Sequence, residues 1–88
     1  MYSVRLLKAA SRELARLNKP IATRIVERIR WLAENLDSAK PIALKGELAG
    51  LYKLREGDYR IIYEMIRKEK VIVIHSIGHR REIYQKKQ

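Results

Sequence analysis

Apolar positions recur along the first half of the chain with two different periods. Residues 2–7 alternate between apolar and polar side chains, which predicts a strand with one buried face. Residues 8–17 change to helical spacing, and a second helix is predicted to begin at Pro20, which suits a first helical turn. This second helix has the strongest periodic signal in the sequence, and we expect the two helices to form a hairpin around a shared core. The apolar stripe of the second helix consists of Ile21, Ile25, Ile29, Leu32 and Leu36.

Strand patterns begin again after a connection over residues 37–49. Residues 51–55 and 58–66 are predicted strands, and they flank a tight turn at Glu56-Gly57. Glycine in a short loop between two alternating segments is typical of a β-hairpin.

The last predicted strand is the most apolar. Polar residues 67–70 lead into residues 71–77, a nearly continuous β-branched run that predicts a central strand with a neighbour on each side. A basic tail follows from His79. The order of strand, helix, helix and three-stranded antiparallel meander predicts one α+β domain over residues 1–88, with the helices packed on one face of the sheet.

Strand alternation gathers cationic side chains on one face of this sheet. A two-residue loop at Glu56-Gly57 pairs Arg55 with Asp58 and Lys53 with Arg60, so Lys53, Arg55 and Arg60 project from the same side. The apolar and aromatic residues between them point to the other side, toward the helices. These are Tyr52, Leu54, Tyr59, Ile61 and Tyr63.

More residues are expected to join this basic face. A turn of two or four residues before the last strand places His75 opposite Ile62 on the same side. Cations directly across a strand pair repel each other, and only Asp58 and Glu64 are available there to offset them. The pattern indicates an anion site, for which phosphate is the natural ligand, and charges simply splayed into solvent are the alternative.

The overall charge supports a polyanionic partner. Lysine and arginine number 20 against 10 acidic residues, which gives a formal net charge of +10 and a pI near 10.2. Nucleic acid is the commonest polyanion for a small, folded, basic domain. A surface kept basic for solubility, or the charged surface of a thermophilic protein, is the alternative.

Other chemistries find few residues to support them. The absence of cysteine excludes disulfides and thiolate metal sites, and two histidines without an acidic cluster make a poor metal site. We therefore expect neither a metal nor another cofactor. No apolar run approaches the ~18 residues of a membrane helix, and no signal peptide is apparent, so we expect a cytoplasmic protein without a membrane partner.

Two stretches carry a resemblance to a known family. Leu44-Lys45-Gly46 followed by residues 51–64 (LYKLREGDYRIIYE) forms the first, and residues 78–84 (GHRREIY) form the second. With them, nearly the whole chain resembles the RelE branch of the RelE/ParE toxin superfamily in length and element order.

The resemblance implies a toxin of a type II toxin–antitoxin system. Such a toxin enters the ribosomal A site and cleaves the messenger RNA there, as a metal-independent endoribonuclease. The 2′-hydroxyl attacks the adjacent phosphate and leaves a cyclic phosphate and a 5′-hydroxyl. The implied partners are the ribosome with its RNA, the messenger, and a cognate RelB-like antitoxin encoded beside the toxin.

The resemblance also implies roles for individual residues. Arg60 would stabilise the charge that develops on the phosphoryl oxygens, with help from Lys53. Arg80 would stabilise or protonate the leaving oxygen, and Tyr84 would stack on a base or orient the 2′-hydroxyl. With the basic tail included, the residues expected to bind RNA or the ribosome are Lys53, Arg55, Arg60, Arg80, Arg81, Lys86 and Lys87.

The sequence departs from the family pattern at Arg55. The best-known members carry there a lysine that is the proposed general base, whereas arginine stays charged. Either Arg55 only binds charge, or the base lies elsewhere. His79 and Tyr84 are the candidates, and we favour His79 because imidazole titrates near neutrality.

Trp31 is a candidate antitoxin contact. It lies opposite the apolar stripe of the second helix, so we expect the core not to bury it fully. An exposed tryptophan among charged residues suits a binding hot spot, and packing against a terminus or a long loop is the alternative.

Two other functions fit parts of the sequence. A ParE-type toxin, which inhibits DNA gyrase and cuts no RNA, would share the fold but not require Lys53, Arg55 and Tyr84 together. A non-catalytic basic RNA-binding module would explain the charge without any catalytic residues.

Overall fold

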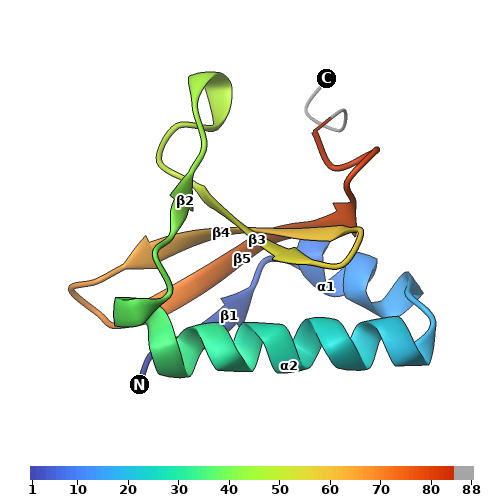
Figure 1. The fold of residues 1–88 in the computed structure, drawn as a ribbon, viewed down its shortest axis with the longest axis horizontal. Coiled ribbons are helices and arrows are strands. Elements are labelled where there is room, and N and C mark those ends of the chain that lie inside the picture. Colours follow the sequence, from blue (N-terminus) through green and yellow to red (C-terminus); the bar gives the residue numbers. More distant parts are fainter. Residues whose placement is uncertain (85–88) are drawn as a thin grey trace.

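The computed structural model describes residues 1–84, which form two α-helices and a five-stranded mixed sheet (Figure 1). The elements are β1 (Ser3–Leu6), α1 (Lys8–Arg16), α2 (Lys19–Asn35), the 3₁₀ turn η1 (Leu36–Ser38), β2 (Ile42–Ala43), the 3₁₀ turn η2 (Gly46–Leu48), β3 (Tyr52–Glu56), β4 (Tyr59–Ile66) and β5 (Val71–His79). The strand order is β1-β5-β4-β3-β2. This is the predicted α+β fold.

The helices begin and end within about one residue of the predicted positions. Only Leu17 and Asn18 separate α1 from α2, and the Asn18 side chain accepts a hydrogen bond from the backbone N–H of Ile21, which caps α2. Pro20 lies in the first turn of α2, where its missing N–H costs nothing. Neither helix within residues 1–84 is long and apolar enough to cross a membrane.

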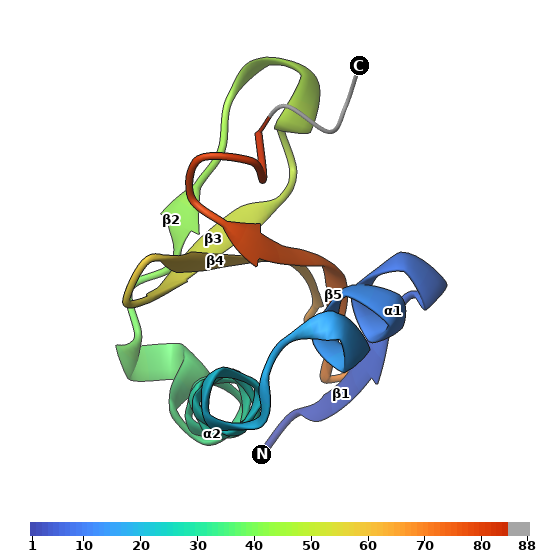
Figure 2. The same ribbon diagram turned by 90° about the vertical axis from the view of Figure 1, so that its right-hand side faces the viewer.

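The helices pack against different strands of the sheet. α2 lies along one face below β3, whereas α1 packs against β5 beside β1 (Figures 1 and 2). Both contribute to one core, so the prediction of a shared core is confirmed. The buried residues of this core are Ala10, Ile25, Ile29, Leu32, Ala33, Leu36, Leu54, Ile61, Tyr63, Ile72, Ile74 and Ile77.

The sheet contains the predicted meander and two further pairings. β5 is a central strand, as predicted, because β4 pairs with it on one side and β1 pairs with it in parallel on the other. β2 is a two-residue strand within the predicted connection, and it pairs with the start of β3. The segment between β2 and β3, and the segment after β5, both rise from the sheet on the side away from α2 (Figure 1).

The β3–β4 turn lies one residue later than predicted. Glu56 pairs with Tyr59, so the two-residue loop is Gly57-Asp58 rather than Glu56-Gly57. Gly57 has a φ of 58°, and a short hairpin loop needs such a positive angle at its first central position, which glycine adopts without strain. The predicted pairing of Lys53 with Arg60 is therefore wrong, and Arg60 lies opposite Arg55.

A β-bulge in β5 corrects a second prediction. The β4–β5 register runs regularly from Ile66↔Val71 to Tyr63↔Ile74, but the next pair is Ile62↔Ser76. His75 is the extra residue, so the prediction that it lies opposite Ile62 is wrong. The bulge returns Ile77 to the core side, where Ile74 and Ile77 are both buried although they are three residues apart.

The pKa of Tyr63 reflects its burial in the core. Burial raises the pKa of Tyr63 to about 12, and Tyr52, which stacks on it with ring centroids 5.7 Å apart, adds to the shift. Because the folded pKa of this phenol exceeds its unfolded value of 10.0, its contribution to the free energy of unfolding is fully present below pH 10. That contribution is lost as the pH rises through the folded pKa.

We predict that Tyr63→Phe removes this part of the pH dependence. Between about pH 9 and about pH 11, the wild-type free energy of unfolding should fall by about 1.4 kcal/mol more than that of the variant. Urea denaturation at a series of pH values measures the difference. Parallel curves for the two proteins would show that Tyr63 titrates normally.

Candidate nucleic-acid interface

Three predicted cationic residues share the sheet face that points away from α2. Arg55 and Arg60 are direct cross-strand partners, and Lys53, two residues before Arg55, lies on the same side by strand alternation. Leu54 and Ile61 are buried on the opposite side. The predicted common face of Lys53, Arg55 and Arg60 is thus confirmed, although their pairing differs.

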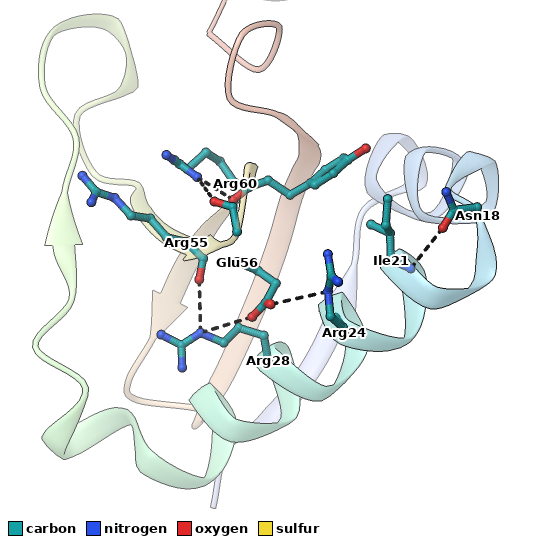
Figure 3. A network of polar contacts seen from close by, with 9 residues as sticks. Asn18, Ile21, Arg24, Arg28, Arg55, Glu56 and Arg60 are labelled. Carbon is teal, nitrogen blue, oxygen red and sulfur yellow. Dashed lines mark hydrogen bonds and ion pairs between the residues drawn. The ribbon is translucent and has the colours of Figure 1, made fainter.

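Arg60 folds back onto the β3–β4 turn (Figure 3). Its Nη1 donates hydrogen bonds to the carbonyl oxygens of Gly57 and Tyr59, each at 2.9 Å. These bonds place the guanidinium charge of Arg60 against the negative ends of two carbonyl dipoles, which offsets part of the repulsion by Arg55. Since both bonds use Nη1, the Nε–Nη2 edge has no partner among residues 1–84, and this edge is suited to bidentate contact with phosphate.

α2 holds the end of β3 from the opposite side. Arg28 Nε donates to the carbonyl oxygen of Arg55 at 3.2 Å, and the Glu56 carboxylate lies 3.7 Å from Arg24 and 4.0 Å from Arg28 (Figure 3). These contacts are partly exposed, so each contributes little to stability by itself. Together they fix the backbone of β3 at Arg55 and therefore the point from which its side chain projects.

The segment after β5 adds Arg80 to the same turn. The Arg80 backbone N–H donates to the carbonyl oxygen of Asp58 at 2.8 Å, and its Nε lies 3.6 Å from the Asp58 carboxylate. The structure therefore brings Arg60 and Arg80 into contact with the same loop. Arg81 is exposed beside them, whereas the predicted contacts Lys86 and Lys87 lie outside the described residues.

His79 and Tyr84, the two candidate bases, are both constrained. The ring of His79 meets Tyr59 edge-on at 5.5 Å, and its Nδ1 accepts a hydrogen bond from the Arg81 backbone N–H at 3.1 Å. A neutral His79 in this arrangement carries its proton on Nε2. The Tyr84 hydroxyl is buried and has no hydrogen-bond partner among residues 1–84.

The acidic residues of this face are already paired. Asp58 forms an ion pair with Arg80, and the Glu64 carboxylate is hydrogen-bonded to Nε2 of His75 at 3.0 Å. None of the acids in residues 1–84 lies within ion-pair distance of Lys53 or Arg55. This arrangement can bind a phosphate and stabilise negative charge on it. No three His, Cys, Asp or Glu side chains gather as metal ligands anywhere in the described part of the chain.

Sequence reasoning missed the residues that support this face from behind. Arg24, Arg28 and Glu13 look like ordinary surface charges of amphipathic helices, although Glu13 accepts a hydrogen bond from the Ile77 backbone N–H at 2.7 Å. Their partners lie far away in the sequence, so no local pattern marks them. The His75–Glu64 pair depends on the bulge, which alternation alone does not reveal.

Trp31 is exposed, as predicted. Its side chain keeps 38% of its surface accessible, and the Arg28 guanidinium lies 4.4 Å from the ring centroid. A second apolar surface lies elsewhere on α2. It is a trough of about 520 Å³ beside β1, which Val4, Val26 and Ile29 help to line.

The chain is similar to known toxins over nearly its whole length. The family model described as "ParE toxin of type II toxin-antitoxin system, parDE" matches residues 4–84. Toxin RelG of Mycobacterium tuberculosis is 34% identical over 87 residues, which cover 97% of this chain and 98% of that protein.

Two solved complexes have the same fold. The toxin–antitoxin complex RelBE2 of Mycobacterium tuberculosis contains a chain with a TM-score of 0.80 and 30% identity, covering 89% of this chain and 96% of that one. The archaeal RelE–RelB complex of Pyrococcus horikoshii contains one with a TM-score of 0.72 and 30% identity, covering 92% and 97%. With these matches and the fold described above, the chain belongs to the RelE/ParE superfamily of type II toxin–antitoxin toxins, as a RelE-like member.

Proposed function

We propose that this toxin binds the ribosome and cleaves messenger RNA in the A site. The observation that carries the proposal is the convergence of Arg55, Arg60 and Arg80 around the β3–β4 turn, with Lys53 on the same face. Phosphate contacts are the natural use of such a cluster on a protein of net charge +10.

The proposed reaction is an internal transesterification. The 2′-oxygen forms a bond to the adjacent phosphorus, and the bond from phosphorus to the 5′-oxygen of the next nucleotide breaks. The 2′-hydroxyl proton passes to a base, and the departing 5′-oxygen takes up a proton. The free edge of Arg60 would contact the phosphoryl oxygens, with Lys53 and Arg55 adding positive charge, and Arg80 would face the leaving oxygen.

Proton transfer is assigned to His79. Arg55 cannot serve as the base, since a guanidinium stays protonated. For His79 to accept the 2′-hydroxyl proton at Nδ1, its hydrogen bond from Arg81 must open when substrate binds. Tyr84 would reach a nucleotide only in another arrangement of residues 80–84, because its hydroxyl is buried here.

We further infer that a cognate RelB-like antitoxin binds this toxin and contacts Trp31. The similar chains from Mycobacterium tuberculosis and Pyrococcus horikoshii are part of a toxin–antitoxin complex, RelBE2, and a RelE–RelB complex. Tryptophan and arginine are among the residues that most often dominate an interface, and here the Arg28 guanidinium lies over the ring of the partly exposed Trp31.

Gyrase inhibition is the competing function, because the matching family model is named for ParE toxins. A supercoiling assay with purified DNA gyrase separates the two. A toxin that blocks supercoiling and leaves ribosome-bound messengers intact would replace our proposal. A protein that binds ribosomes but neither cuts RNA nor blocks gyrase would be a plain binding module.

The first functional prediction concerns cleavage itself. Wild-type toxin added to ribosomes with a defined messenger should cut in the A site, and should still cut with a chelator that removes transition metals but leaves the ribosome's magnesium. Arg60→Ala should slow cutting by roughly 10²–10³-fold, because it removes a donor aimed at developing charge. Primer extension maps and times the cuts.

Arg67→Ala is the matched control for Arg60→Ala. Arg67 is exposed in the β4–β5 turn, at the other end of β4 from Arg60. Its replacement by alanine changes the net charge by the same amount as Arg60→Ala. This variant should cut at nearly the wild-type rate. Full activity in a folded Arg60→Ala protein would remove Arg60 from the mechanism.

The second prediction concerns the base. The cleavage rate should rise with pH through neutrality, because only neutral imidazole accepts a proton, and His79→Gln should lower the rate and flatten that profile. His75→Gln, at the only other histidine, should keep the wild-type profile. A rate that falls with pH in the wild type, but not in His79→Gln, would make His79 a proton donor through Nε2 instead.

The third prediction concerns the antitoxin. Trp31→Ala should weaken antitoxin binding by roughly tenfold or more, the loss expected at an interface hot spot. Val26→Ala is the control, since Val26 is equally exposed, at 39%, but lines the trough on another side of α2. Isothermal titration calorimetry measures both affinities. Loss of affinity in the Val26 variant alone would place the antitoxin in the trough.

A further inference from the structure

Within residues 1–84, no strand pairs with the last part of β5 on the side away from β4. β1 pairs with β5 only as far as Leu6↔Ile74, and the Leu7 N–H to Ile74 carbonyl bond is the last backbone hydrogen bond between them. Beyond it, α1 covers the edge of β5 (Figure 2). A helix has no free backbone groups along its side, so this edge needs a side-chain partner.

Glu13 of α1 supplies that partner. Its Oε1 accepts a hydrogen bond from the Ile77 backbone N–H at 2.7 Å, in a partly buried position. Hydrogen bonds to a carboxylate are shorter and stronger than neutral ones, and a buried N–H without an acceptor is costly. The contact lies directly after the His75 bulge, where the ladder of β5 has been shifted by one residue.

The bond to Glu13 also lies directly before the candidate site. Ile77 precedes Gly78 and His79, and the Arg80 N–H is bonded to the Asp58 carbonyl oxygen at 2.8 Å. The short segment that carries His79 is therefore held by α1 at Ile77, by its pairing with Tyr59 and Arg60 of β4, and by the β3–β4 turn at Arg80. A shift of β5 at Ile77 would move His79 and Arg80 relative to Arg60.

We propose that Glu13 is a positioning residue, which sets the place of His79 and Arg80 against the β3–β4 turn through the Ile77 amide. The inference rests on the proposed cleavage function and assigns Glu13 no contact with RNA. What matters in it is the acceptor oxygen at this position rather than the negative charge, so glutamine should serve in place of glutamate.

The test compares Glu13→Ala, Glu13→Gln and Glu34→Ala. Glu34 is an exposed acid of α2, so its replacement changes the net charge as Glu13→Ala does but leaves β5 untouched. Single-turnover cleavage on ribosomes should be slowed roughly tenfold or more by Glu13→Ala, because small misplacements of reacting groups are expensive. Ribosome affinity should stay within about twofold, since the phosphate-binding cations are retained. Glu13→Gln and Glu34→Ala should both cut at close to the wild-type rate.

Amide hydrogen exchange provides a readout that does not depend on activity. Exchange at the Ile77 amide should accelerate in Glu13→Ala, whereas Glu13→Gln should keep most of the protection. This comparison remains decisive if Glu13→Ala is too unstable to assay, because loss of protection in a folded Glu13→Gln protein overturns the role of the acceptor oxygen.

The remaining outcomes separate this inference from the proposed function. Active wild-type toxin with equally fast cutting by folded Glu13→Ala overturns the inference and leaves the function standing. Slow cutting by both Glu13 variants also overturns it, because charge would then be responsible. Wild-type toxin that cuts no messenger overturns the proposed function and, with it, the catalytic role of Glu13, even if exchange confirms the anchor.

Discussion

Two guanidinium side chains, Arg55 and Arg60, are held directly opposite each other on β3 and β4, and the candidate site depends on this like-charge pairing. Such a pair is unfavourable by itself. It persists because the other face of the same strands is buried: Leu54 and Ile61 are fixed in the core, and a slip of one residue would turn arginine inward. The hydrophobic core therefore enforces a concentration of positive charge that the charges alone would disperse.

The surrounding contacts reduce this cost without cancelling the charge. Arg60 donates hydrogen bonds to two carbonyl oxygens, and Asp58 forms an ion pair with Arg80 and not with Arg55. On the helix side, Glu56 is occupied by Arg24 and Arg28. The acids nearest the site thus stabilise the loop and the strand ends, and the excess charge remains for an anion. A site built in this way gains stability when a polyanion binds.

The sequence predicts those features that depend on parity and little that depends on distant partners. The sequence predicts the turn one residue too early, yet it predicts the correct face for Lys53, Arg55 and Arg60, because the observed pairing differs from the predicted one by an even number of residues. The bulge leaves no such signal, because residues 71–74 are all apolar and alternation cannot be followed through them. The bond between Glu13 and Ile77 joins residues 64 positions apart and also leaves no trace in local periodicity.

The arrangement of candidate bases bears on why a ribosome would be required. Arg55 cannot give up its proton, Nδ1 of His79 is engaged by Arg81, and the Tyr84 hydroxyl is buried. Within residues 1–84, the candidate site therefore presents positive charge without an available base among these groups. Two of these three groups belong to residues 79–84, the segment that follows Ile77, whose amide is bonded to Glu13.

Under the proposed function, ribosome binding would have to rearrange this segment, or orient the messenger so strongly that weak proton transfer suffices. Such orientation can supply several kcal/mol of the barrier. Under this proposal, either route would make activity conditional on the ribosome, because the cations proposed to bind phosphate are preorganised and the group proposed to move the proton is not.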